Sequence, residues 1–169
     1  AARLGLRTVC FTINLDAVGN MPCNPSIGGT GKGHLVRELD ALGGEMARAA
    51  DRACIQYRLL NRGKGPAVWS LRAQADRRTY QRVMKATLEE QENLWVKQAE
   101  VVAIRTEQGA VSAVVTHTGA VYAVKAAIVA TGTYLGGRTI VGEVVRDSGP
   151  DGLAAALPLT QCLMELGLS

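Results

Sequence analysis

A glycine-rich stretch with a single lysine is the part of this sequence whose residue types are best suited to chemistry. Residues 24–33 contain Gly28, Gly29, Gly31 and Lys32 and directly precede a helical pattern. Such a segment lets the backbone press close to a phosphate-bearing ligand at a helix N-terminus. Gly33 rather than Ser or Thr follows Lys32, which argues against the phosphate loop of ATPases. The other interpretation is that the glycines serve a tight turn.

The four cysteines do not form a metal-binding or disulfide pattern. They are scattered through 169 residues, without a C-x-x-C pair and without histidine at ligand spacing. Free thiols in a reducing cytoplasm account for them most simply, and we expect no metal site.

Basic residues are concentrated in one part of the chain. Eight basic residues and one acidic residue lie between Arg58 and Lys85, although the net charge of the whole chain is only +4. This stretch suits a polyanion such as RNA, or equally a solvated helix surface. No apolar run is long enough to span a bilayer, so a cytoplasmic protein without a membrane segment is expected.

The order of predicted elements begins with a helix end at residues 1–7 and a strand at 8–13. A loop at 14–33 and a helix at 34–48 follow, the helix with an apolar stripe of Leu35, Leu39, Leu42 and Met46. Residues 53–60 read as strand or turn, and 71–91 as a long helix with Tyr80, Val83 and Met84 on its buried face. A helix end before the first strand indicates a chain that starts inside a β-α-β unit, and hence a fragment.

The second half changes to a β pattern. A strand at 94–99 precedes an antiparallel meander at about 100–124, with turns at Gln108-Gly109 and Thr118-Gly119. A buried strand at 126–132, a loop at 136–158 and a helix at 159–166 complete the order. A meander inserted before a strand that ends in Ala-Thr-Gly is typical of flavin-binding Rossmann-type domains. We therefore predict an α/β fold of the FAD/NAD(P)-binding, glutathione-reductase-like type, incomplete at both ends.

This fold predicts a first set of cofactor-binding residues. Asn14 and Asp16 follow the strand whose end commonly meets the adenosine ribose, with a simple turn as the alternative. Thr131 and Gly132 would approach the nucleotide's phosphate and ribose, and Val101 would hold the adenine through its backbone. The alternatives are a strand-ending turn for the first pair and an ordinary core valine for Val101.

Several blocks of sequence resemble the MnmG (GidA) family of tRNA uridine 5-carboxymethylaminomethyl modification enzymes. They are collinear over most of the chain: residues 12–16, 23–29, 32–44, 60–61, 64–68, 72–76 and 131–135. The resemblance implies that residues 1–169 are part of an FAD-binding domain whose first strand and dinucleotide fingerprint precede residue 1. It also implies that the isolated fragment is inactive.

The resemblance also implies an activity and its participants. The family modifies the wobble uridine of certain tRNAs with FAD, with NADH and methylenetetrahydrofolate as co-substrates. Its members form homodimers and work with a GTPase, MnmE.

Individual residues receive roles from the same resemblance. Cys23 matches a cysteine that would activate the uridine by adding to its ring, with Lys32 nearby to lower the thiol pKa. Gly28, Gly29 and Lys32 would line the flavin or the substrate entry. Arg62, Lys64 and Arg72 would lie near the tRNA or the flavin. Two positions depart from the family's pattern. Trp69 stands where a basic residue is expected, and Ala155-Ala156 stands where a Pro-Ser pair is expected.

Two other functions remain open on the sequence. One is a folate- and FAD-dependent tRNA uridine methyltransferase-like flavoprotein, against which blocks 64–68 and 72–76 argue. The other is a non-catalytic RNA- or partner-binding module built on the basic stretch, which would bind tRNA in a salt-sensitive way without flavin.

Overall fold

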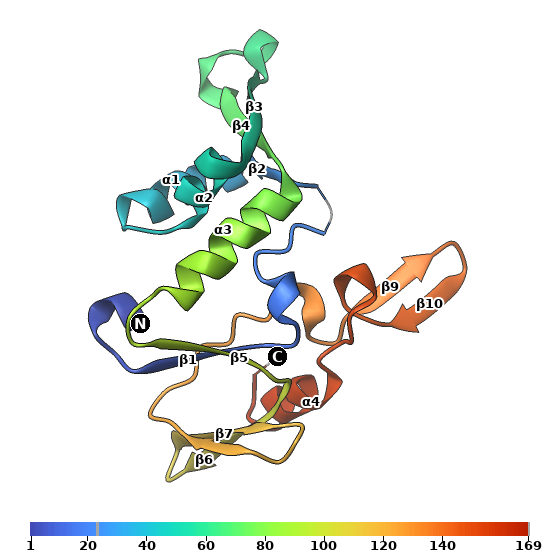
Figure 1. Cartoon of the computed structure of the whole chain (residues 1–169). Coiled ribbons are helices and arrows are strands. Elements are labelled where there is room, and N and C mark those ends of the chain that lie inside the picture. Colours follow the sequence, from blue (N-terminus) through green and yellow to red (C-terminus); the bar gives the residue numbers. More distant parts are fainter. Residues whose placement is uncertain (23, 169) are drawn as a thin grey trace. The chain divides into compact units, whose positions relative to one another are not determined.

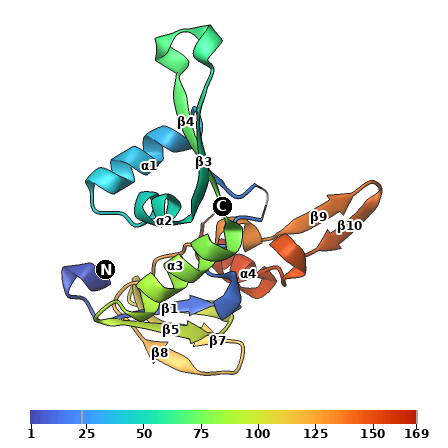
Figure 2. The ribbon, with the colours of Figure 1, turned by 45° about the horizontal axis from the view of Figure 1, so that its top comes forward.

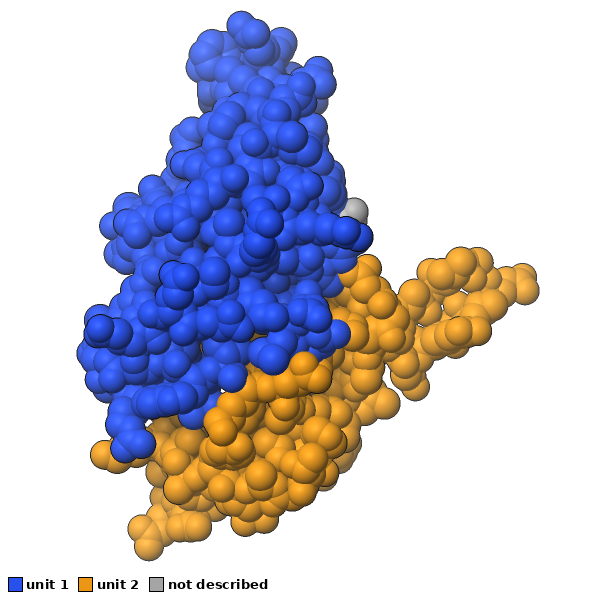
Figure 3. All heavy atoms as spheres, in the orientation of Figure 1, with its two compact units in different colours: residues 1–10, 14–96 blue, residues 11–13, 97–169 orange. Residues whose placement is uncertain are grey.

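The computed structural model describes residues 1–22 and 24–168, and these form two compact units (Figure 3). Unit 1 contains residues 1–10 and 14–96, and unit 2 contains residues 11–13 and 97–169. Within the described part of the chain, no helix is long and apolar enough to cross a bilayer.

An antiparallel three-stranded sheet organises unit 1. Its strands β2 (Ser26–Gly28), β4 (Ser70–Ala75) and β3 (Cys54–Leu60) are hydrogen-bonded in that order (Figure 1). The predicted loop at 14–33 therefore contains a strand, and the predicted helix is wrong over residues 71–76. In β4, Ala73 and Ala75 are buried and alternate with less buried residues, which is the period of a strand.

Helix α3 (Arg77–Glu89) begins directly after this strand because Asp76 caps it. The Asp76 carboxylate accepts a hydrogen bond from the Thr79 N–H at 2.5 Å, which satisfies one of the free donors of the first turn. Hydrogen bonds from the Thr79 side chain and backbone lower the pKa of Asp76, and the positive charges of Arg82 and Arg78 lower it further. The predicted helix is thus confirmed from residue 77 onward.

Two helices replace the single helix predicted for residues 34–48. Helix α1 (Lys32–Ala41) ends before Gly43, which has φ +83°, and α2 (Met46–Ala53) starts anew. The Gly44 N–H bonds to the Leu39 carbonyl at 2.7 Å, and a Cβ on Gly44 would lie equally close to that oxygen. The predicted stripe is wrong for its three leucines: Val36 is the buried residue of α1, while Leu35 and Leu39 of α1 and Leu42 at its C-cap are exposed. Met46, the fourth residue of the stripe, packs against the core.

The core of unit 1 lies between the sheet and its helices. Tyr80 of α3 is buried, with Val83 and Met84 packed beside it, which confirms the predicted buried face of that helix. The buried members of this cluster are Met21, Ile27, Val36, Ala49, Ala50, Ala53, Ala75 and Tyr80.

Two short strands form a parallel pair. Strand β1 (Thr8–Thr12) lies beside β5 (Leu94–Gln98), as both were predicted (Figure 2). The Thr8 N–H donates to the Asn93 carbonyl and the Ala99 N–H to the Thr12 carbonyl, so the two strands run in the same direction. The chain before β1 is a short 3₁₀ turn (Ala2–Leu4) ending at Gly5, which confirms the predicted helix end.

Unit 2 contains the predicted meander. Strands β6 (Val101–Glu107), β7 (Ala110–Thr116) and β8 (Val121–Ala123) pair antiparallel in sequence order. Gln108 and Gly109 both have positive φ, as the tight turn between β6 and β7 requires. Helix α4 (Leu157–Glu165) contributes Leu159 and Leu163 to a small core with Val101 and Ile104.

The region between the meander and α4 differs from prediction. Residues 126–131 are not a strand, and Ile128 and Val129 are exposed. Their β-branched composition favours a strand, but a strand also needs a hydrogen-bonding neighbour, and no described segment pairs with them. The predicted loop at 136–158 instead contains a hairpin of β9 (Arg138–Val141) and β10 (Val144–Asp147).

Candidate functional site

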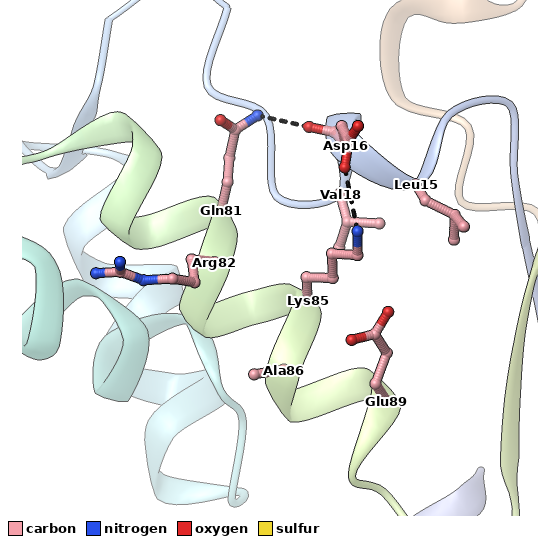
Figure 4. A pocket seen from close by; sticks show the side chains of 8 residues that line it. All are labelled: Leu15, Asp16, Val18, Gln81, Arg82, Lys85, Ala86 and Glu89. Carbon is pink, nitrogen blue, oxygen red and sulfur yellow. Dashed lines mark hydrogen bonds and ion pairs between the residues drawn. The ribbon is translucent and has the colours of Figure 1, made fainter.

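A cavity of about 350 Å³ adjoins the turn that follows β1 (Figure 4). The turn is a short 3₁₀ segment (Leu15–Ala17), and the opposite wall is one face of α3. The lining residues are Leu15, Asp16, Val18, Gln81, Arg82, Lys85, Ala86 and Glu89. The structure therefore places the predicted residue Asp16 at a cavity.

Asp16 is held by side chains of α3 and stays open to solvent. Lys85 Nζ lies 3.1 Å from Asp16 Oδ1, and Gln81 Nε2 donates to the Asp16 backbone carbonyl at 3.3 Å (Figure 4). The Asp16 side chain is 87% exposed. Asn14 shapes the turn, because its side-chain oxygen accepts the Asp16 N–H at 2.8 Å. Lys85 and Gln81 were not predicted; their spacing of four residues on a helix places them on one face.

The glycine-rich stretch forms the close contact between β2 and β4. Gly28 has φ +121°, and a Cβ there would lie 2.2 Å from the Leu71 carbonyl oxygen. The Gly29 N–H donates to that same oxygen at 2.9 Å. Strand packing alone thus requires glycine at position 28, whereas Gly29 and Gly31 face open space. Lys32 is bound locally, its Nζ donating to the Ser26 carbonyl at 3.2 Å.

A second cavity of about 140 Å³ lies between this glycine turn, α1, α2 and the sheet. Tyr57 and Trp69 line it, together with His34 and Arg37 of α1. None of these four residues was predicted as a site residue. The Tyr57 hydroxyl donates to Asp51 Oδ1 at 2.5 Å, and this bond raises the pKa of Tyr57 above its usual range.

The three predicted tRNA residues lie on β3–β4 and its tip. Arg62 and Lys64 are exposed in a short 3₁₀ turn (Arg62–Lys64), and the Trp69 indole N–H bonds to the Arg62 carbonyl at 3.3 Å. Arg72 is directly opposite Gly28 in the β2–β4 register. The sheet therefore brings Arg72 beside the glycine-rich stretch.

The remaining predicted residues belong to unit 2 or fall outside the described residues. Val101 begins β6 and packs against the core of unit 2. Thr131 precedes a 3₁₀ turn whose first residue, Gly132, has φ +59° and open space where a Cβ would lie. Cys23 lies outside the described residues. Among the residues that are described, no group of three His, Cys, Asp or Glu side chains could hold a metal ion.

The fold of this chain matches that of known proteins closely. A crystal structure of Aquifex aeolicus GidA superposes with a TM-score of 0.90 at 45% identity, over 97% of this chain and 27% of that one. The GidA-related protein from Thermus thermophilus shares the fold at a TM-score of 0.63 and 22% identity, over 98% of this chain and 60% of that one. The chain is thus an α/β protein of the Rossmann type predicted from its sequence.

The sequence comparisons define the family. The family described as glucose inhibited division protein A matches residues 1–169. A relative from Caldicellulosiruptor saccharolyticus, named tRNA uridine 5-carboxymethylaminomethyl modification enzyme MnmG, is 62% identical over 167 residues. One of the same name from Clostridium kluyveri is 56% identical over 169 residues. Each alignment covers 99% of this chain and 27% of the relative, so the chain spans about a quarter of their length. The chain belongs to the GidA (MnmG) family.

Proposed function

We propose that this chain is a segment of an FAD-dependent enzyme that forms 5-carboxymethylaminomethyluridine at the wobble position of tRNA. The observation that carries the proposal is the 62% identity over 167 residues to a relative named for that modification. The chain would act as part of a longer homodimeric cytoplasmic protein together with an MnmE-like GTPase. Both compact units would belong to one FAD-binding domain, with the meander as its insertion.

The turn after β1 fits the adenosine part of FAD. In Rossmann-type domains a carboxylate at the carboxyl end of a strand accepts hydrogen bonds from ribose hydroxyls. Asp16 stands at this end of β1, beside a cavity, and only one of its oxygens is engaged by Lys85 among the described residues. The second carboxylate oxygen is therefore available to a ribose hydroxyl.

Thr131 and Gly132 would also bind FAD. A Cβ added to Gly132 would have no atom within 4 Å apart from its chain neighbours, so a ligand can approach the backbone closely there. Val101 would contribute backbone groups to the adenine, and Gly28, Gly29 and Lys32 would line the flavin or the substrate entry. FAD would supply the redox chemistry, with NADH and methylenetetrahydrofolate as co-substrates.

Cys23 would activate the uridine. Addition of its thiolate to C6 of the uracil ring would place nucleophilic character on C5, where the new substituent is attached. This role follows from the sequence blocks around Cys23, and Arg62, Lys64 and Arg72 would contact the tRNA.

A hybrid enzyme that carries this chain tests the proposal. The matching segment of the Caldicellulosiruptor saccharolyticus relative is replaced by this chain, and the hybrid is expressed in a bacterium that lacks its own enzyme. We expect mass spectrometry of tRNA nucleosides to detect the modified wobble uridine. Cys23→Ser should abolish it, whereas the matched variant Cys54→Ser should retain it.

Other products would contradict the proposal. Only 5-methyluridine above the background of the host would support the methyltransferase alternative. Bound tRNA without any new nucleoside would support the non-catalytic RNA-binding module. Equal activity of the Cys23→Ser and Cys54→Ser hybrids would remove Cys23 from the mechanism.

A further inference from the structure

Two arginines face each other across the antiparallel strands β3 and β4. Arg58 and Arg72 are directly opposite in the register, one pair away from Leu59 and Leu71. Side chains of directly opposite residues project from the same face of a sheet, with their β-carbons about 5 Å apart. Like charges in this arrangement repel each other, so the pair is unfavourable unless something neutralises it.

Among the described residues, no carboxylate neutralises the pair. The same face carries Gln56 and Gln74 on one side and Leu60 and Ser70 on the other. Gly28, the neighbour of Arg72 on β2, adds no side chain there. Within residues 1–22 and 24–168, neither guanidinium forms an ion pair, and Arg72 Nε is buried without a hydrogen-bond partner. Buried donors are nearly always satisfied, so an unsatisfied one indicates a missing acceptor.

Further cations continue from this pair to the tip of the same element. We call residues 54–75 the β3–β4 arm; it projects from α1 and α2 within unit 1 (Figures 1 and 2). Arg62 and Lys64 are exposed in its tip and likewise lack a carboxylate partner among the described residues. The arm contains no acidic residue at all.

We propose that the Arg58–Arg72 pair binds a backbone phosphate of RNA, with Arg62 and Lys64 contacting further phosphates of the same strand. A phosphate presents several acceptor oxygens to the planar fork of a guanidinium, and two opposed arginines can share one such group. A row of cations without carboxylates fits a repeating anion better than a single carboxylate ligand. The inference rests on the proposed function, because it takes tRNA as the RNA.

The test measures how tRNA binding to the hybrid protein depends on salt. Each phosphate contact contributes roughly 0.7 to 0.9 to the slope of log K against log salt concentration. Because the pair would hold one phosphate, the double variant Arg58→Gln/Arg72→Gln should lower the slope by roughly 0.7 to 0.9 and weaken binding by about tenfold at moderate salt. The matched control is Arg105→Gln, at an exposed position on β6, which should change neither the slope nor the affinity for tRNA.

A charge-preserving variant separates electrostatics from folding. Arg58→Lys/Arg72→Lys should keep most of the slope, whereas an equal loss in the lysine and glutamine variants would overturn the inference. An unchanged slope in the glutamine variant would also overturn it. Loss of bound flavin with an unchanged slope would assign the pair to the flavin pyrophosphate instead of RNA. Failure of the unaltered hybrid to bind tRNA would contradict the proposed function itself.

Discussion

Gly28→Ala should strongly destabilise unit 1. At φ +121° a side chain strains the backbone by roughly 1–3 kcal/mol. The new Cβ would also lie 2.2 Å from the Leu71 carbonyl oxygen and 2.9 Å from the Arg72 α-carbon, so β2 and β4 must separate. The Gly29 N–H bond to Leu71 then weakens, at a further cost of about 1 kcal/mol. We expect a loss of roughly 3–5 kcal/mol, a large share of the stability of an ordinary domain.

Urea unfolding of this chain, followed by circular dichroism, measures this loss. The matched control is Gly31→Ala, because Gly31 has an ordinary negative φ and no atom within 4 Å of an added Cβ. The control should stay within about 0.5 kcal/mol of the parent. Equal stability of the two alanine variants would refute the assignment of Gly28 to the close contact between strands.

Three further predictions concern the packing and the titration of unit 1. Tyr80→Ala removes a buried ring and should lower the free energy of unfolding by roughly 3–5 kcal/mol; a urea midpoint equal to that of the parent would contradict this. Asp76→Ala should lower the urea midpoint at neutral pH. Because the bonds from Thr79 depress the folded-state pKa of Asp76, its contribution is present above the unfolded pKa and is lost as the pH falls through the folded value. The difference between variant and parent should therefore vanish in acid, and a constant difference would argue against it. Tyr57→Phe should remove one late-titrating phenol from the ultraviolet titration of the folded chain, because the bond to Asp51 raises the pKa of Tyr57.

Local sequence patterns predicted the structure correctly where the residues of one segment determine that segment's structure. The strand at β1, the meander and its Gln108-Gly109 turn were predicted because alternation and turn chemistry act over a few residues. The helix at 71–91 was predicted too long, because residues 71–75 (Leu, Arg, Ala, Gln, Ala) are all strong helix formers although they alternate as a strand. Asp76 was the signal for the true start, since it is a favoured N-cap residue.

Elements that depend on distant partners were not predictable in this way. The stripe of Leu35, Leu39 and Leu42 marks an apolar helix face, but the sequence does not say what covers it, and in this chain the face is exposed. Residues 126–131 have strand composition without a pairing partner among the described residues.

In the candidate site, too, the sequence predicted what depends on local position but not what depends on distant partners. Asp16 was predicted from its position after a strand, and it does lie at a cavity. Its contact with Lys85 spans 69 residues and required the packing of α3 beside the turn. The opposition of Arg58 and Arg72 depends on strand register, which a single sequence specifies only weakly.

The absorbance spectrum of the purified hybrid protein tests the central claim, that this chain forms part of a flavin-binding domain, most directly. We predict a yellow protein with the visible bands of bound FAD. Asp16→Ala should weaken FAD retention during dialysis, while the matched control Asp40→Ala, an exposed position on α1, should not. A folded hybrid that stays colourless after incubation with FAD would contradict the claim.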